Sequence, residues 1–157
     1  MIPPLPDDSM RMADPAGRGT GIMSADAPKP GLALPSVWVI DDYADAAESL
    51  AMVLRACGYV VSVARSGREA LVLTPLPDAV ILELRLRDAD GCDLVKSLRA
   101  RAGGGHASFI AVTTCGRPED IARSKAAGIT AHLVKPAEVR DVLSALGGVR
   151  REMSART

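Results

Sequence analysis

Residues 77–91 read PDAVILELRLRDADG, and the first half of this stretch decides the fold. Residues 79–84 form a run of apolar side chains that a single charge, Glu83, interrupts. A short apolar run followed by turn-forming residues is typical of a strand buried inside a parallel sheet. Because a buried charge is costly unless it is paired, Glu83 is a candidate functional residue.

Four similar runs flank this one, at residues 37–40, 60–64, 109–113 and 131–134, and we interpret all five as buried strands. The segments between them have helical patterns, with apolar residues at three- and four-residue spacing and capping residues or glycines at their ends. These signals are Leu50, Val53, Leu54 and Cys57 before Gly58; Ser66 and Glu69; Leu94, Val95 and Leu98 before Gly103–Gly105; Pro118 to Gly128; and Val139, Val142, Leu143 and Leu146 before Gly147 and Gly148. The alternation predicts an α/β fold, a three-layer, doubly wound parallel sheet with strand order 2-1-3-4-5.

The chain has room for one such domain, which we expect over residues 36–148, with a short C-terminal tail over 149–157. Residues 1–35 contain seven of the eleven prolines and lack a periodic apolar pattern. This composition predicts a disordered N-terminal tail. Met10, Met12 or Met23 is an alternative start of the protein.

Composition excludes several classes of function. Nineteen basic and nineteen acidic residues cancel, so nucleic acid is not an expected partner. No run is long and apolar enough to cross a membrane, and the first residues do not resemble a signal peptide. Cys57, Cys92 and Cys115 are too scattered for a disulfide framework, which favours reduced thiols in a cytoplasmic protein. Glycine-rich nucleotide motifs and hydrolase motifs do not occur, so no organic cofactor is expected.

Polar side chains follow four of the five predicted strands. Asp41 and Asp42 come after the first strand, Glu83 ends the third, Thr113 the fourth and Lys135 the fifth. The carboxyl ends of parallel strands share one edge of the sheet, where ligands bind. Carboxylates, a divalent cation, a hydroxyl and a lysine are the groups that phosphoryl transfer to a carboxylate requires. Turns, helix caps and solvated strand ends explain the polar residues at each strand end alone, but not at the four strand ends together.

Four stretches resemble the receiver domain of bacterial two-component response regulators. They are VWVIDD at 37–42, PDAVILELRLRDADG at 77–91, IAVTT at 110–114 and GITAHLVKP at 128–136. The resemblance covers about 110 residues, almost everything after the tail. It implies a flavodoxin-like fold of five βα units.

The resemblance also implies roles at the site. Asp41, Asp42, the side chain at position 83 and the backbone carbonyl of Arg85 would hold Mg²⁺. Thr113 would be the switch hydroxyl, Lys135 the phosphate-binding lysine and His132 the switch residue that is usually aromatic. Pro136 would follow a cis peptide bond.

The departure from the family pattern is Glu83, which stands where the family has its phosphate-accepting aspartate. Glutamate is longer by about 1.5 Å, and a misplacement of about 1 Å can lower a rate by about 10²-fold. We therefore predict that Glu83 is not a working phosphoacceptor and that Mg²⁺ binds weakly or not at all. Glu83 either imitates the phosphoryl group at Thr113 and Lys135 or only pairs with Lys135 in a rigid scaffold, and we favour the scaffold.

These residues predict a stand-alone receiver, not an enzyme, that binds proteins without being phosphorylated. The expected partners are a histidine kinase, a phosphotransfer protein or another response regulator, bound through the surface from Pro118 to Leu146. The charges on that surface fit an ordinary solvated face equally well. The alternative function is a phosphate-accepting receiver that uses Glu83, Asp88 or Asp90. We expect a monomer or a weak homodimer.

Overall fold

The structure, a computed structural model, describes residues 34–101 and 104–155. Nearly all of the predicted disordered tail, and with it Met10, Met12 and Met23, lies outside the described residues. Among the described residues, no helix is both long enough and apolar enough to pass through a membrane.

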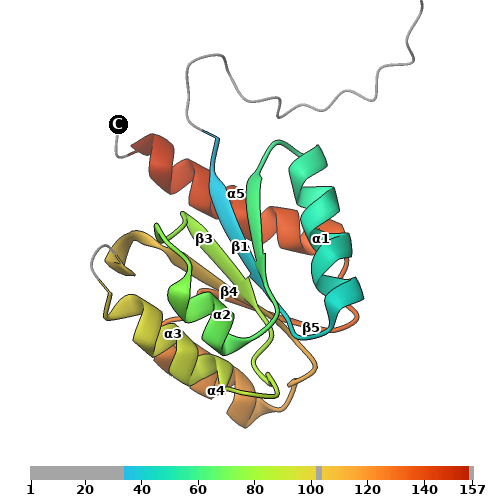
Figure 1. Cartoon of the computed structure of the whole chain (residues 1–157), viewed down its shortest axis with the longest axis vertical. Helices are drawn as coiled ribbons and strands as arrows, with labels where there is room; N and C mark the ends of the chain where they lie inside the picture. The colour runs from blue at the N-terminus through green and yellow to red at the C-terminus, as the bar shows by residue number, and fades with distance from the viewer. Residues whose placement is uncertain (1–33, 102–103, 156–157) are drawn as a thin grey trace, which may run out of the picture.

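A single sheet of five strands forms the centre of the molecule, in the order β2-β1-β3-β4-β5 (Figure 1). All four neighbouring pairs are parallel, which confirms the predicted topology. The strands are β1 (Ser36–Ile40), β2 (Val60–Ala64), β3 (Ala79–Leu82), β4 (Ser108–Thr113) and β5 (Ala131–Val134). The helices are α1 (Ala44–Ala56), α2 (Gly67–Val72), α3 (Gly91–Arg99), α4 (Pro118–Ala127) and α5 (Val139–Ala155), with a 3-10 turn at Gly104–His106.

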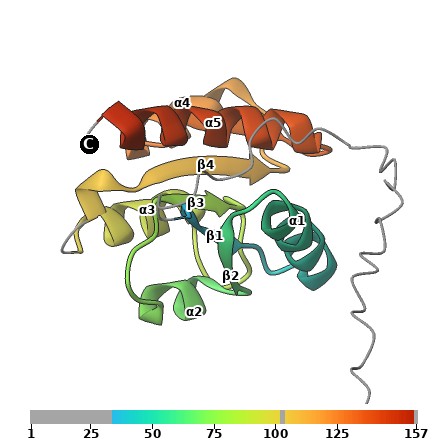
Figure 2. The same cartoon turned by 90° about the horizontal axis from the view of Figure 1, so that it is seen from above.

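The two faces of the sheet carry separate apolar cores, as the three-layer prediction requires. Trp38, Val80 and Phe109 pack on one face with side chains of α2, α3 and α4. Val39 and Ile81 pack on the other face with side chains of α1 and α5. Figure 2 shows α5 and α2 on opposite sides of the strands.

The outer strands are less buried than predicted. β1, β3 and β4 are buried almost throughout, but Val60 in β2 is 54% exposed and Val134 in β5 is 43% exposed. Each outer strand has a neighbour on one side only, and the helices cover it incompletely. The prediction of five buried strands is therefore wrong for β2 and β5.

The predicted helix ends are correct for α1 and α4 and wrong for α5. Gly58 and Gly128, which follow α1 and α4, have positive φ angles of 91° and 95°. Gly147 and Gly148 do not end α5, which continues to Ala155. A glycine inside a helix costs only about 1 kcal/mol, and Val149 adds a further buried residue to the stripe that packs on the sheet.

Candidate functional site

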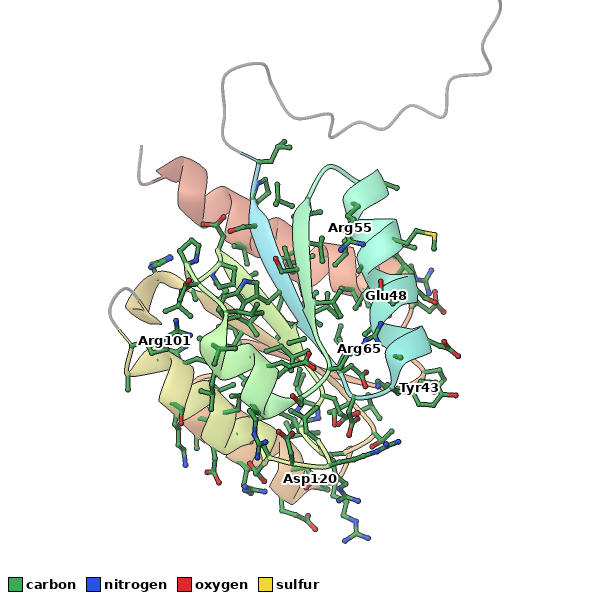
Figure 3. All side chains as sticks on the ribbon, viewed as in Figure 1. Tyr43, Glu48, Arg55, Arg65, Arg101 and Asp120 are labelled. Carbon is green, nitrogen blue, oxygen red and sulfur yellow. The ribbon has the colours of Figure 1, made fainter. Side chains whose placement is uncertain are left out.

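The carboxyl ends of four adjacent strands meet at one edge of the sheet, where the sequence predicted a site. Parallel pairing continues just beyond the strands: the Glu83 amide donates to the Ile40 carbonyl at 2.9 Å, and the Lys135 amide to the Thr113 carbonyl at 2.8 Å. These bonds hold the backbones beside the site in register. Figure 3 labels Tyr43 and Asp120, which lie at this end of the molecule.

Glu83 is the centre of the site and is only 5% exposed. Its Oε1 accepts hydrogen bonds from the Thr113 hydroxyl and, at 3.0 Å, from the Arg85 amide. Its Oε2 accepts a hydrogen bond from the Thr114 amide at 3.3 Å and lies 3.3 Å from Lys135 Nζ. Four donors thus converge on one carboxylate.

These donors keep Glu83 ionised. Burial alone would raise the pKa of Glu83, but the hydrogen bonds from Thr113 and Arg85 and the charge of Lys135 outweigh burial and lower the pKa.

The loop after Glu83 folds back closely, because the Gly91 amide donates to the Leu84 carbonyl at 2.7 Å. A Cβ at Gly91 would lie 2.8 Å from the Glu83 carbonyl oxygen, so this approach requires glycine.

Lys135 joins two carboxylates. Its ammonium lies 2.7 Å from Asp41 Oδ2 and 3.3 Å from Glu83 Oε2. Burial would lower the pKa of Lys135, but the contacts with Asp41 and Glu83 raise it, so the side chain is charged. The Lys135–Pro136 peptide bond is cis, as the resemblance implied.

The carboxylates that were predicted to bind metal are turned towards protein donors. Asp41 Oδ1 accepts a hydrogen bond from the Tyr43 amide at 2.9 Å, while its other oxygen meets Lys135. Asp42 Oδ2 accepts a hydrogen bond from the Arg87 amide at 2.8 Å and lies 3.7 Å from Arg87 Nε. In residues 34–101 and 104–155, no three acidic, histidine or cysteine residues are grouped so that they could hold a metal ion. Both oxygens of Asp41 and one oxygen of Asp42 thus already have protein donors.

Of the two residues expected to act as switches, Thr113 contacts Glu83 directly, and His132 contacts Cys115 and α4. Thr113 is fully buried, and its hydroxyl oxygen accepts a hydrogen bond from the Cys115 amide at 3.1 Å. His132 contacts the Cys115 carbonyl through Nε2 at 2.7 Å and the Ser124 hydroxyl through Nδ1 at 2.8 Å. The sequence interpretation missed Ser124. The available signal was its place three residues before Ala127, on the face of α4 that is buried.

The other two candidate nucleophiles cap helices. Asp88 accepts hydrogen bonds from the Gly67 and Arg68 amides at 2.9 and 3.0 Å, at the start of α2. These two bonds lower the pKa of Asp88. Asp90 is the N-cap of α3 and forms an ion pair with Arg123 at 3.0 Å. These contacts favour structural roles for both aspartates.

A groove of about 850 Å³ opens between α1 and α5 and reaches the site. Tyr43, Leu50 and Val53 line it from the side of α1, and Val142 lines it from α5. Glu83 also contributes to its wall. A molecule in this groove would approach the carboxylate from the side of α1.

The sequence of residues 37–147 matches the response regulator receiver domain. Among curated proteins, the transcriptional regulatory protein PrrA of Mycobacterium leprae is 30% identical over 80% of this chain and 54% of its own length. The transcriptional regulatory protein PdtaR of Mycobacterium tuberculosis is 31% identical over 70% of this chain and 54% of its own. The chain thus spans about half the length of these relatives.

Solved structures agree with this result. The chemotaxis response regulator CheY4 of Vibrio cholerae superposes with a TM-score of 0.69 at 28% identity, over 74% of this chain and 99% of its own. A response regulator structure from Chloroflexus aurantiacus has a TM-score of 0.69 at 30% identity, over 74% of this chain and 98% of its own. With the five-stranded parallel sheet and the convergent strand ends, these matches place the chain in a family. It belongs to the response regulator receiver domains of two-component signalling.

Proposed function

We propose that this receiver binds partner proteins without being phosphorylated, because the Glu83 carboxylate takes the place of a phosphoryl group. The observation that carries the proposal is the convergence of the Thr113 hydroxyl, the Thr114 amide and Lys135 on Glu83. In this proposal Glu83 stands at the phosphoacceptor position. Receiver domains are generally not classical enzymes, and they interact with histidine kinases, phosphotransfer proteins and other response regulators.

Imitation fits the contacts better than the rigid scaffold that the sequence favoured. If Glu83 only paired with Lys135, it would use one oxygen, and its second oxygen would not need a donor from Thr113. Here Oε2 faces Lys135 while Oε1 receives the Thr113 hydroxyl and the Arg85 amide. The imitation is incomplete, since a carboxylate has one charge and two oxygens, and a phosphoryl group has about two charges and three oxygens.

The same contacts disfavour phosphate transfer to Glu83. A nucleophilic oxygen needs a lone pair aimed at the incoming phosphorus, and both Glu83 oxygens already accept protein donors. The donors that would stabilise transferred phosphate are the ones that now hold the carboxylate. A phosphorus bonded to Glu83 would displace them, because it would lie where they meet.

The arrangement also supports weak Mg²⁺ binding or none. Receiver domains typically bind Mg²⁺ at the phosphorylation site. Asp41, Asp42 and Glu83 would be the ligands here, but Lys135 already bridges Asp41 and Glu83, and Asp42 faces Arg87. A divalent ion would have to displace the ammonium, and it would have to turn Asp42 away from its partner.

The surface from Pro118 to Leu146 is the proposed docking surface for a kinase, a phosphotransfer protein or another response regulator. It exposes three apolar side chains, Ile121 on α4, Val134 on β5 and Val139 on α5, by 40–43% each. Charged residues, including the Arg140–Glu138 pair, surround them. We place this activity in the cytoplasm, because Cys57, Cys92 and Cys115 are free thiols.

The test uses amide hydrogen exchange of α4 with and without beryllium fluoride and Mg²⁺, which together imitate a phosphoryl group on aspartate. The native chain should not respond, because Glu83 already holds Thr113. Glu83→Asp should respond by roughly tenfold in protection, which corresponds to about 1.4 kcal/mol. Glu48→Asp, an exposed exchange of the same type, should behave as the native chain does. A native chain that responds as strongly as Glu83→Asp would refute the proposal.

A further inference from the structure

β2 is one of the two edge strands of the sheet, and β5 is the other. β2 pairs with β1 alone, and Figure 2 shows it between α1 and α2. An edge strand has backbone amides and carbonyls that no second strand satisfies, so it can pair with a strand of another chain. Natural proteins often prevent such pairing with charged residues or prolines in the edge strand. β2 has the sequence VVSVA, which contains neither.

The outward backbone groups of β2 belong to Val61 and Val63. At one end of the strand the Val60 amide donates to a carbonyl just before β1, and at the other end the Ala64 carbonyl accepts from the amide just after β1, both at 3.1 Å. Residues that bond to the same neighbouring strand alternate along a strand. Val61 and Val63 therefore turn their amides and carbonyls away from β1.

The side chains of β2 leave this edge accessible. Val60 is 54% exposed and Ser62 is also exposed, while Ala64 is buried. The side chains of Val61 and Val63 pack against the apolar core that includes residues of α1. What β2 offers to another chain is thus mainly backbone, flanked by the exposed side chains of Val60 and Ser62.

Arg55, in the last turn of α1, covers part of the edge. Its Nη2 donates to the Val61 carbonyl at 3.0 Å, in an exposed contact. Figure 3 labels Arg55 together with Glu48 and Arg65, whose ion pair at 3.3 Å also joins α1 to the end of β2. In the described part of the chain, the outward amide of Val61 and the backbone groups of Val63 have no such partner. An exposed hydrogen bond adds little net stability, because water replaces it, so Arg55 can yield the carbonyl to another donor.

We propose that two copies of this chain pair antiparallel through β2 and that Arg55 limits this pairing. In a pair centred on Ser62, Val61 of each copy lies opposite Val63 of the other. Each outward amide then meets an outward carbonyl, which is the arrangement of a hydrogen-bonded antiparallel pair. The Val61 carbonyl cannot serve both Arg55 and the second copy without loss, so the side chain and the second strand compete for it.

A second copy fits this edge chemically. The two Ser62 side chains would lie directly opposite each other, and neither carries a charge. Exposed Val60 would lie opposite Ala64 of the other copy, which forms an apolar pair. The nineteen basic and nineteen acidic residues of each chain cancel, so the two copies do not repel one another through net charge.

Pairing through β2 leaves the opposite edge of the sheet free. β5, and with it the proposed docking surface from Pro118 to Leu146, lies at that opposite edge. A dimer would therefore present this surface twice, which raises the apparent affinity for a partner that has two binding sites. The pairing itself does not depend on the proposed function.

Charged residues at position 62 test the pairing in the full chain. Ser62→Lys and Ser62→Glu each place like charges directly opposite one another, which disfavours the pair. In sedimentation equilibrium each variant alone should be monomeric at concentrations where the native chain is partly dimeric. An equal mixture of the two variants should restore the dimer, because opposite charges then face each other. Ser97→Lys and Ser97→Glu, exposed changes on α3, are the matched controls and should dimerise as the native chain does.

Arg55→Ala tests the limit on pairing. Loss of its hydrogen bond to Val61 should raise the association constant roughly tenfold, because each copy otherwise has to release this bond. The amides of Val61 and Val63 should exchange with water more slowly in the dimer than in the monomer. Arg140→Ala removes an exposed arginine of α5 that pairs with Glu138, and it should leave the association constant unchanged.

Three results would overturn the proposal. If the native chain and Arg55→Ala both stay monomeric, the edge of β2 does not pair. If a native dimer persists in Ser62→Lys, the copies meet through another surface. If the mixture of Ser62→Lys and Ser62→Glu stays monomeric, the two positions do not lie opposite each other.

Discussion

The Thr113 hydroxyl donates a hydrogen bond to Oε1 of Glu83, although the two residues lie 30 positions apart in the sequence. Both side chains are buried, at 0% and 5% exposure. Adjacent parallel strands, β3 and β4, bring them together at the edge of the sheet. This contact joins the acidic centre of the site to the loop that leads to α4.

Removal of the Thr113 hydroxyl should destabilise the domain. Thr113→Ala removes one of the two donors to Glu83 Oε1 and leaves the Cys115 amide without its Thr113 acceptor, which costs about 1–3 kcal/mol for a buried polar group. Urea unfolding measures this loss. Thr114→Ala is the control, because its side chain is exposed and only its backbone amide contacts Glu83. Equal stability of the two variants would contradict the assigned contact.

The stability of the domain should fall in acid through Glu83. Its pKa lies below its ordinary value of 4.5 despite burial, because Thr113, Arg85 and Lys135 stabilise the ionised form. The contribution is fully present above the unfolded-state pKa and is lost as pH falls through the lower folded-state pKa. Urea unfolding from about pH 6 to about pH 2.5 should show a larger loss for the native chain than for Glu83→Gln. If the free energies of unfolding of the native chain and of Glu83→Gln fell in parallel with pH, Glu83 would not contribute to the loss of stability in acid.

Lys135→Met should change the affinity for Mg²⁺. The substitution removes the cation that bridges Asp41 and Glu83 and leaves their charges uncompensated. A divalent ion should then bind more tightly than in the native chain, because oxygen ligands attract it and no ammonium competes. Titration calorimetry with Mg²⁺ measures this. Lys125→Met, an exposed change on α4, is the control and should leave the affinity for Mg²⁺ as it is. A native chain that binds Mg²⁺ as tightly as Lys135→Met would contradict the prediction.

Alanine in place of Gly147 should stabilise the domain. Gly147 lies inside α5, and in the described part of the chain no atom other than those of its chain neighbours and its own helix backbone lies within 4 Å of the position where a Cβ would be added. The free energy of unfolding should rise by about 0.5–1 kcal/mol, because alanine restricts the unfolded chain and favours a helix. Gly128→Ala should have the opposite effect, since φ is +95° there and the Cβ would lie 2.7 Å from Arg99 Nε. Thermal unfolding distinguishes the two, and destabilisation by Gly147→Ala would argue that α5 ends earlier.

The sequence predicted the topology and which side chains meet at the edge of the sheet, because both depend on local patterns. Apolar runs marked the strands, and parallel strands necessarily bring Asp41, Glu83, Thr113 and Lys135 to one edge of the sheet. The end of α5 was not predictable from its glycines, since the burial of Val149 on the sheet decides it. Tertiary packing overrode a local stop signal.

The hydrogen bonds of the site could not be predicted from the sequence. Whether Asp42 faces a metal or Arg87 depends on the path of the loop after β3, and that path depends on the close approach at Gly91. The partner of His132 is Ser124, eight residues earlier on another element. No short-range pattern connects these two residues.

The most direct test of the account is the intact mass of the native protein after incubation with a small phosphodonor and Mg²⁺, with Glu83→Asp and Glu48→Asp treated in parallel. The native chain and Glu48→Asp should stay unmodified, and Glu83→Asp should gain one phosphate, which hydroxylamine removes. A hydroxylamine-sensitive phosphate on Glu83 of the native chain would contradict it.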